Sequence, residues 1–121
     1  MPDPYATPRR FPRVKILGNV TGKAFLQEDV TLLDLSEGGA LLEHAGRFRL
    51  GSICFLRLPG PEGEVLLKGR VVHSAASRTV PDMAGELTLL YHSGVEFVRL
   101  TAEALAALRQ ILVSVGEVPP A

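Results

Sequence analysis

The chain has 121 residues, with 13 basic and 13 acidic side chains, so its formal net charge is zero. Its length fits a single domain, and 46% hydrophobic with 21% charged residues is typical of a folded globular protein. These values exclude two domains of ordinary size and wholesale disorder. They also exclude a general nucleic-acid coat, which needs a basic surface.

Signals for secretion, cross-linking and membrane insertion are missing from the sequence. The single cysteine, Cys54, cannot form an intrachain disulfide. No apolar run approaches the roughly 20 residues of a transmembrane helix. Prolines interrupt the first residues before any apolar stretch begins, which does not fit a signal peptide. We therefore expect a cytoplasmic protein without membrane insertion.

Residues 1–13 are predicted to form a mobile N-terminal arm. Four prolines in this stretch each fix their own φ and bias the preceding residue toward extended backbone. From residue 14 the sequence alternates with a period near two and breaks at turns such as Gly38-Gly39 and Pro59-Gly60-Pro61, which favours β-strands. Residues 75–85 are predicted to form a loop. The six predicted strands are 14–20, 27–36, 40–43, 52–58, 65–74 and 87–98.

The hydrophobic period changes to that of a helix after residue 100. Thr101 is a candidate N-cap, and Glu103 lies in the first turn, where the helix dipole favours an acidic side chain. Gly116 and the prolines after it would end the helix. The apolar stripe of this helix is Leu105, Leu108, Leu112 and Val115.

These elements predict a mainly β fold, a small six-stranded antiparallel β-barrel with a C-terminal α-helix packed on it. A sheet this short must close or be covered to remove its edges. The predicted folded domain spans residues 14–116, and residues 117–121 form a tail.

An arginine-rich segment precedes the first strand. Arg9 and Arg13 form an Arg-x-x-x-Arg pattern, with Arg10 between them. Guanidinium is a planar fork that binds phosphate, or the O6/N7 edge of guanine, through two hydrogen bonds. The segment is thus a candidate anion site, and the structural alternative is a solvated basic arm.

A second pattern, Asp-x-Ser-x-x-Gly, covers Asp34, Ser36 and Gly39. Residues two apart on a strand share a face, so the sequence predicts a carboxylate and a hydroxyl side by side on the outer face, with Leu33 and Leu35 facing the core. A carboxylate can accept the N1–H and N2–H of guanine. Gly39 allows positive φ or a close approach of ligand to backbone. The structural alternative is an ordinary turn rich in these residue types.

Together these two patterns resemble the PilZ domain family of bacterial cyclic di-GMP receptors. The resemblance runs from about Arg9 to Val115 and includes the stretch 93–98, which is similar to the family's last strand. It implies that the arginines clamp phosphates and the Hoogsteen edge of guanine, and that the second motif holds a guanine. The implied ligand-binding residues are Arg9, Arg10, Arg13, Asp34, Ser36 and Gly39.

The resemblance implies a non-catalytic receptor that binds cyclic di-GMP and signals to an unidentified downstream protein. Relatives that bind a stacked ligand pair often have an arginine where this chain has Pro8, which favours a single ligand or leaves the stoichiometry open. One alternative is a PilZ-like interaction module without ligand binding, for example in pilus or motility machinery. Another is a small-barrel binder of single-stranded nucleic acid, which the balanced charge and the absence of tryptophan disfavour.

Metal and catalytic sites are not expected. The three histidines and Cys54 match no zinc-ligand spacing. Ser36, Ser74 and Ser93 lack a nucleophile-elbow sequence or an evident base. We therefore predict no metal, no cofactor and no enzymatic activity.

Overall fold

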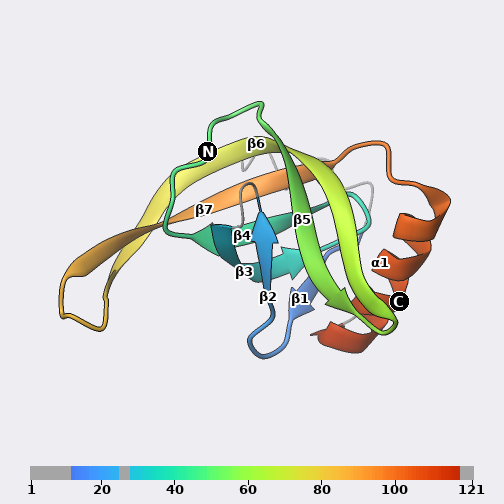
Figure 1. Cartoon of the computed structure of the whole chain (residues 1–121), viewed down its shortest axis with the longest axis horizontal. Coiled ribbons are helices and arrows are strands. Elements are labelled where there is room, and N and C mark those ends of the chain that lie inside the picture. The colour runs from blue at the N-terminus through green and yellow to red at the C-terminus, as the bar shows by residue number, and fades with distance from the viewer. Residues whose placement is uncertain (1–11, 25–27, 118–121) are drawn as a thin grey trace.

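The computed structural model describes residues 12–24 and 28–117. This part of the chain forms one antiparallel sheet and one helix (Figure 1). The strand order is β2-β5-β6-β7-β4-β3-β1-β8. The elements are β1 (Val14–Ile16), β2 (Thr21–Ala24), β3 (Glu28–Leu35), β4 (Gly39–His44), β5 (Ile53–Gly60), β6 (Gly63–Pro81), β7 (Leu87–Phe97), α1 (Ala102–Val115) and β8 (Gly116–Glu117).

The sheet is curved, but it is not the closed barrel that the sequence predicts. Strand β2 pairs with β3 over four residue pairs, whereas its pairing with β5 is limited to Lys23↔Arg57 within the described residues. A single pair does not continue the hydrogen-bonded ladder around the sheet. The six strands β2 to β7 therefore form an incomplete barrel. The short strands β1 and β8 extend the sheet beyond β3.

Two predicted segments have different boundaries in the structure. The expected strand 14–20 is too long: β1 ends at Ile16, Gly18 adopts φ 79°, and the next strand, β2, begins only at Thr21. The expected loop 75–85 is wrong, because β6 continues to Pro81 and pairs with β7 as far as Leu87. Residues 75–79 are exposed on both faces of the strand, so they carry no hydrophobic alternation from which a strand could be predicted.

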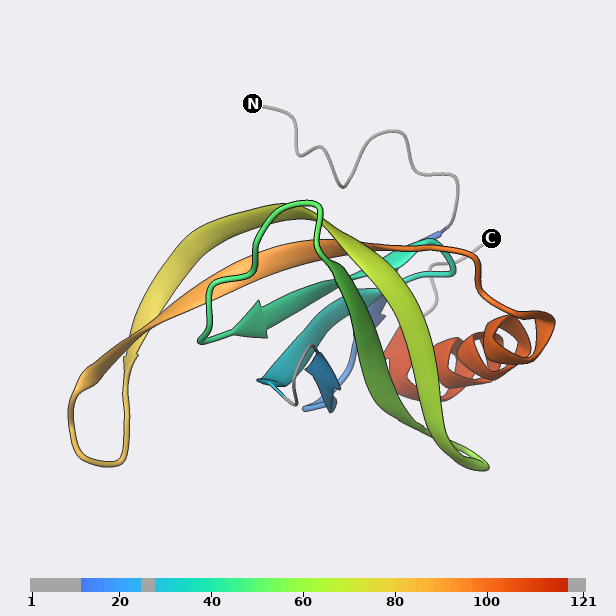
Figure 2. The same ribbon diagram turned by 45° about the horizontal axis from the view of Figure 1, so that its top comes forward.

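The extended parts of β6 and β7 form a hairpin that projects beyond the body of the sheet (Figures 1 and 2). Its turn is short, and the Asp82 carboxylate accepts hydrogen bonds from the backbone N–H groups of Ala84 and Glu86, at 2.9 Å each. Of the predicted loop 75–85, only residues 82–85 therefore lie outside the strands.

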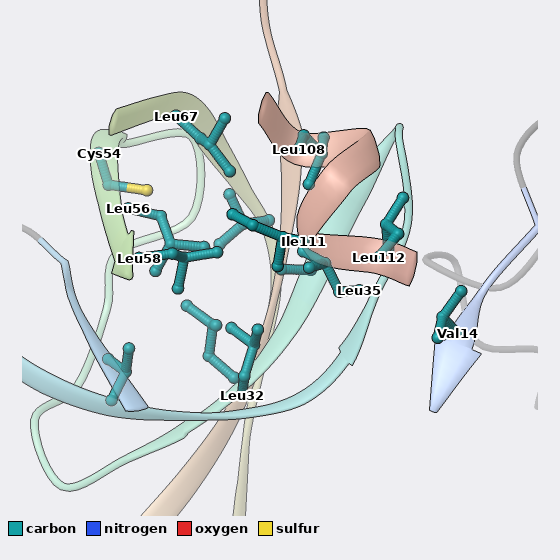
Figure 3. Packing of buried hydrophobic residues seen from close by; sticks show 14 of the residues in the cluster. Val14, Leu32, Leu35, Cys54, Leu56, Leu58, Leu67, Leu108, Ile111 and Leu112 are labelled. Atoms are coloured by element: carbon teal, nitrogen blue, oxygen red, sulfur yellow. The ribbon is translucent and has the colours of Figure 1, made fainter. Parts of the chain in front are cut away.

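The core lies on the concave side of the sheet, where α1 covers it (Figure 3). Leu108 and Leu112 of the predicted helical stripe are buried, together with Ile111, whereas Leu105 is only partly buried. The helix begins as expected, since the Thr101 hydroxyl accepts a hydrogen bond from Ala104 N–H. The remaining buried members of this core come from the strands and the loop after β4: Val14, Val30, Leu32, Leu35, Ala40, Leu42, Phe48, Cys54, Leu56, Leu58, Leu67, Val71 and Val95.

Within the described ranges, no helix combines the length and the apolar character that crossing a bilayer requires.

Candidate functional site

A β-bulge near the end of β3 determines which side chains leave the core. Leu32 pairs with Leu42 on β4, but Asp34, two residues later, pairs with the adjacent Leu41. A bulge adds one residue to a strand and shifts the alternation of faces. Leu32 and Leu35 are consequently both buried. The expectation that Leu33 shares the core face with Leu35 is wrong, because Leu33 is only partly buried. Asp34, next to Leu35 on the strand, lies on the outer face.

The end of the arginine motif and the start of the second motif meet at β1 and β3. Val14 pairs with Leu35 and Lys15 with Asp34, which brings Arg13 next to the aspartate. Arg13 Nη1 lies 3.5 Å from Asp34 Oδ2, and the two side chains are 11% and 13% exposed. A guanidinium and a carboxylate are thus held together in a largely dehydrated position. Arg9 and Arg10 lie outside the described residues.

Ser36 and Gly39 form the turn that follows. The Ser36 hydroxyl accepts hydrogen bonds from the N–H groups of Gly38 (3.1 Å) and Gly39 (3.2 Å), and Ser36 N–H donates to Gly39 O (2.9 Å). Ser36 is 5% exposed, so its hydroxyl faces into the turn and not outward beside Asp34 as the sequence predicts. Strand β3 has ended at Leu35, and its alternation does not continue through the turn. Gly39 is not among the described residues with positive φ.

Two contacts attach this turn to the rest of the domain. Phe97 N–H on β7 donates to Gly38 O at 2.8 Å, and the Arg109 guanidinium on α1 forms an ion pair with Glu37. Arg109 carries no signal in the sequence, since an exposed arginine on a helix is ordinary. Its role is visible only because the fold brings α1 to the turn.

The side chains of His44, Ser93 and Ser74 form a network of polar contacts at the His44 end of β4. His44 is 3% exposed, contacts Gly46 O through Nδ1, and lies 2.7 Å from Ser93 Oγ through Nε2. Ser93 is fully buried, and its Oγ lies 3.0 Å from Ser74 Oγ, so it is inaccessible as a nucleophile.

No group of three metal-binding side chains occurs among the residues that the structure describes. Burial raises the pKa of the Cys54 thiol to about 11, which keeps it protonated at neutral pH.

His44 is expected to make the stability of the domain fall at mildly acidic pH. Burial lowers the His44 pKa below its ordinary 6.5, and the ring stacks on Phe48 at a centroid distance of 3.6 Å. The unfolded chain therefore takes up a proton at a higher pH than the folded chain does. This contribution to stability is complete above pH 6.5 and is lost as the pH falls through the window below it.

Urea unfolding at pH 7 and pH 5 measures this effect. The loss of unfolding free energy between the two pH values should be smaller in His44→Phe, which keeps a stacked ring but cannot take up a proton. The Glu43 pKa is lowered chiefly by its hydrogen bond with Arg78, so that carboxylate loses its contribution only below about pH 4.5. An equal loss in both proteins would contradict the assignment to His44.

Comparisons with known proteins were made on the sequence and on the fold. The PilZ domain family model matches residues 7–114. A search of the curated proteins finds no match. The fold is similar to the PilZ domain of YcgR from Escherichia coli with c-di-GMP, with a TM-score of 0.68, 16% identity, and coverage of 90% of this chain and 92% of that one.

The fold is also similar to MrkH of K. pneumonia. Its c-di-GMP complex has a TM-score of 0.61 and 17% identity, and its apo state has a TM-score of 0.58 and 18% identity. Each comparison covers 90% of this chain, but only 52% and 49% of MrkH. The chain therefore spans about half the length of MrkH.

Proposed function

Since this chain belongs to the PilZ domain family, we propose that it is a receptor for cyclic di-GMP that signals to a partner protein. The observation that carries the proposal is the contact between Arg13 and Asp34. The fold brings together one residue from each of the two motifs, although they are 21 positions apart in the sequence.

The chemistry of this pair suits the proposed ligand. The guanidinium of Arg13 can bind a phosphate or the Hoogsteen edge of guanine, and the carboxylate of Asp34 can accept guanine N1–H and N2–H. Ser36 then acts through the backbone, because its hydroxyl positions the N–H groups of Gly38 and Gly39. Arg9 and Arg10 complete the proposed site from the N-terminal arm, and Gly39 provides close approach to the backbone.

We infer that binding is transmitted to α1 and β8. Glu37, within the motif turn, forms an ion pair with Arg109 of α1. Strand β1, which follows Arg13 directly, pairs with β8 at Lys15↔Glu117 and Ile16↔Gly116. Ordering of the arm on the ligand would therefore act on the middle of the helix, through Arg109, and on its C-terminal end, through β8, and would change the surface offered to a partner. Ordering costs conformational entropy, which charge-assisted hydrogen bonds offset.

Titration calorimetry tests the proposal. Cyclic di-GMP should bind with micromolar or tighter affinity, on the order of 8 kcal/mol or more. Cyclic di-AMP should bind much more weakly, because adenine lacks the N1–H and N2–H donors that a carboxylate accepts. Affinity for cyclic di-GMP no better than millimolar would overturn the receptor function.

The alternative is a PilZ-like interaction module without ligand binding, for example in pilus or motility machinery. The Arg13–Asp34 contact favours it in one respect, since each group already has an oppositely charged neighbour and a ligand must share or displace that contact. The same titration separates the two functions. The absence of catalysis and of nucleic-acid binding, and a cytoplasmic location, stay predictions.

A further inference from the structure

The outer face of the sheet beside the motif turn carries a second pair of charged side chains. Leu35, Ala40, Val95 and Val71 form one row across β3, β4, β7 and β6, and all four are buried. The rows on either side of it must point outward, because neighbouring residues on a strand alternate. One of these outward rows joins Asp34, Leu41 and Gly94. The other joins Gly39, Glu96 and Arg70.

Arg70 and Glu96 repeat the functional groups of Arg13 and Asp34 on the far side of the site. Both side chains are exposed, and neither has a hydrogen bond or ion pair with another residue in the described ranges. Strands β3 and β6 are separated by three interstrand spacings, or about 14 Å. Between the two charged pairs lie Leu41 and the glycines Gly39 and Gly94, of which only Leu41 adds a side chain to the outer face. Leu41 is partly buried, and both glycines are buried.

Cyclic di-GMP likewise presents its functional groups in two copies. It is a two-fold symmetric ring with two phosphates and two guanines, and each half offers one anionic group and one guanine edge. A site that binds both halves can use one guanidinium–carboxylate pair for each half. The motif residues supply one pair, and the register of β7 and β6 supplies the other.

We propose that Arg70 and Glu96 bind the second half of a single cyclic di-GMP molecule that lies across β4 and β7. This inference rests on the proposed receptor function and extends it to the stoichiometry and to specificity. Arg70 binds phosphate or the Hoogsteen edge of the second guanine, and Glu96 accepts hydrogen bonds from its N1–H and N2–H. One ligand per chain follows, because both charged pairs are used by one molecule.

Calorimetry on purified variants of the full chain tests this arrangement. Arg70→Ala should weaken cyclic di-GMP binding by about 10- to 100-fold, the effect of losing hydrogen bonds to a charged group. The matched control is Arg47→Ala, which removes an exposed arginine after β4, at the end opposite to Gly39. This control should bind like the wild type, with one ligand per chain.

Cyclic GMP–AMP separates guanine recognition from general electrostatics. It has the same ring and phosphates but only one guanine, so the wild type should bind it more weakly than cyclic di-GMP. Glu96→Gln should reduce that preference, whereas Glu62→Gln, on the β5–β6 turn, should preserve it.

The outcomes separate this inference from the receptor function. Tight wild-type binding with Arg70→Ala equal to Arg47→Ala, or two ligands per chain, would overturn the second-half contacts and leave the receptor function standing. Wild-type affinity no better than millimolar would overturn both.

Discussion

Replacing Asp34 with alanine is expected to weaken cyclic di-GMP binding by about 100-fold, or roughly 2.7 kcal/mol. The carboxylate is proposed to accept two N–H groups of guanine, and a hydrogen bond to a charged group contributes about 1.5–3 kcal/mol. Alanine also removes the carboxylate that lies 3.5 Å from Arg13 Nη1, so the guanidinium loses a neighbour that helps to position it. Titration calorimetry with cyclic di-GMP measures the change.

The charge-matched control is Asp29→Ala, which removes an exposed carboxylate from the same strand, five residues earlier. It should leave the affinity within a few-fold of the wild type. Circular dichroism of both variants checks that the sheet is intact. If Asp34→Ala and Asp29→Ala bind equally well, the second motif does not contact the ligand in this chain.

Replacing Leu108 with alanine is expected to lower the unfolding free energy by about 2–5 kcal/mol. Leu108 is fully buried between α1 and the concave face of the sheet, so the truncation removes apolar contacts and leaves a cavity (Figure 3). This is a large fraction of the roughly 5–15 kcal/mol that stabilises an ordinary domain. Urea unfolding followed by circular dichroism measures it.

Val113→Ala on the same helix is the control, because this side chain is 79% exposed. Its effect should stay within about 0.5 kcal/mol, since alanine also has the higher helix propensity. Equal destabilisation by the two substitutions would mean that α1 is not held to the sheet by its buried stripe.

The sequence alone was sufficient for the features that depend on short stretches of chain. Hydrophobic period two indicated most of the strands, and period 3.6 with the Thr101 cap indicated α1. The family, confirmed by the match over residues 7–114, was evident from the two motifs and the order of the elements. These signals are readable because each depends on residues within a few positions of one another.

The site depended on pairings that no local pattern specifies. Because of the bulge before Asp34, Leu32 faces the core, whereas the sequence predicts that Leu33 does. The Ser36 hydroxyl forms hydrogen bonds within the turn and does not point outward beside Asp34. Arg109 and Arg70 carried no signal at all, because an exposed arginine on a helix or strand is commonplace.

By itself the sequence therefore determined the helix and most of the strands, the family, and the charged residues of the two motifs. Only the tertiary structure decided that Arg13 lies against Asp34, that Arg109 reaches Glu37, and that the sheet stays incompletely closed. The physical reason is that strand register and bulges are set by which strands become neighbours. That choice depends on the burial of the whole core, to which residues distant in sequence contribute together.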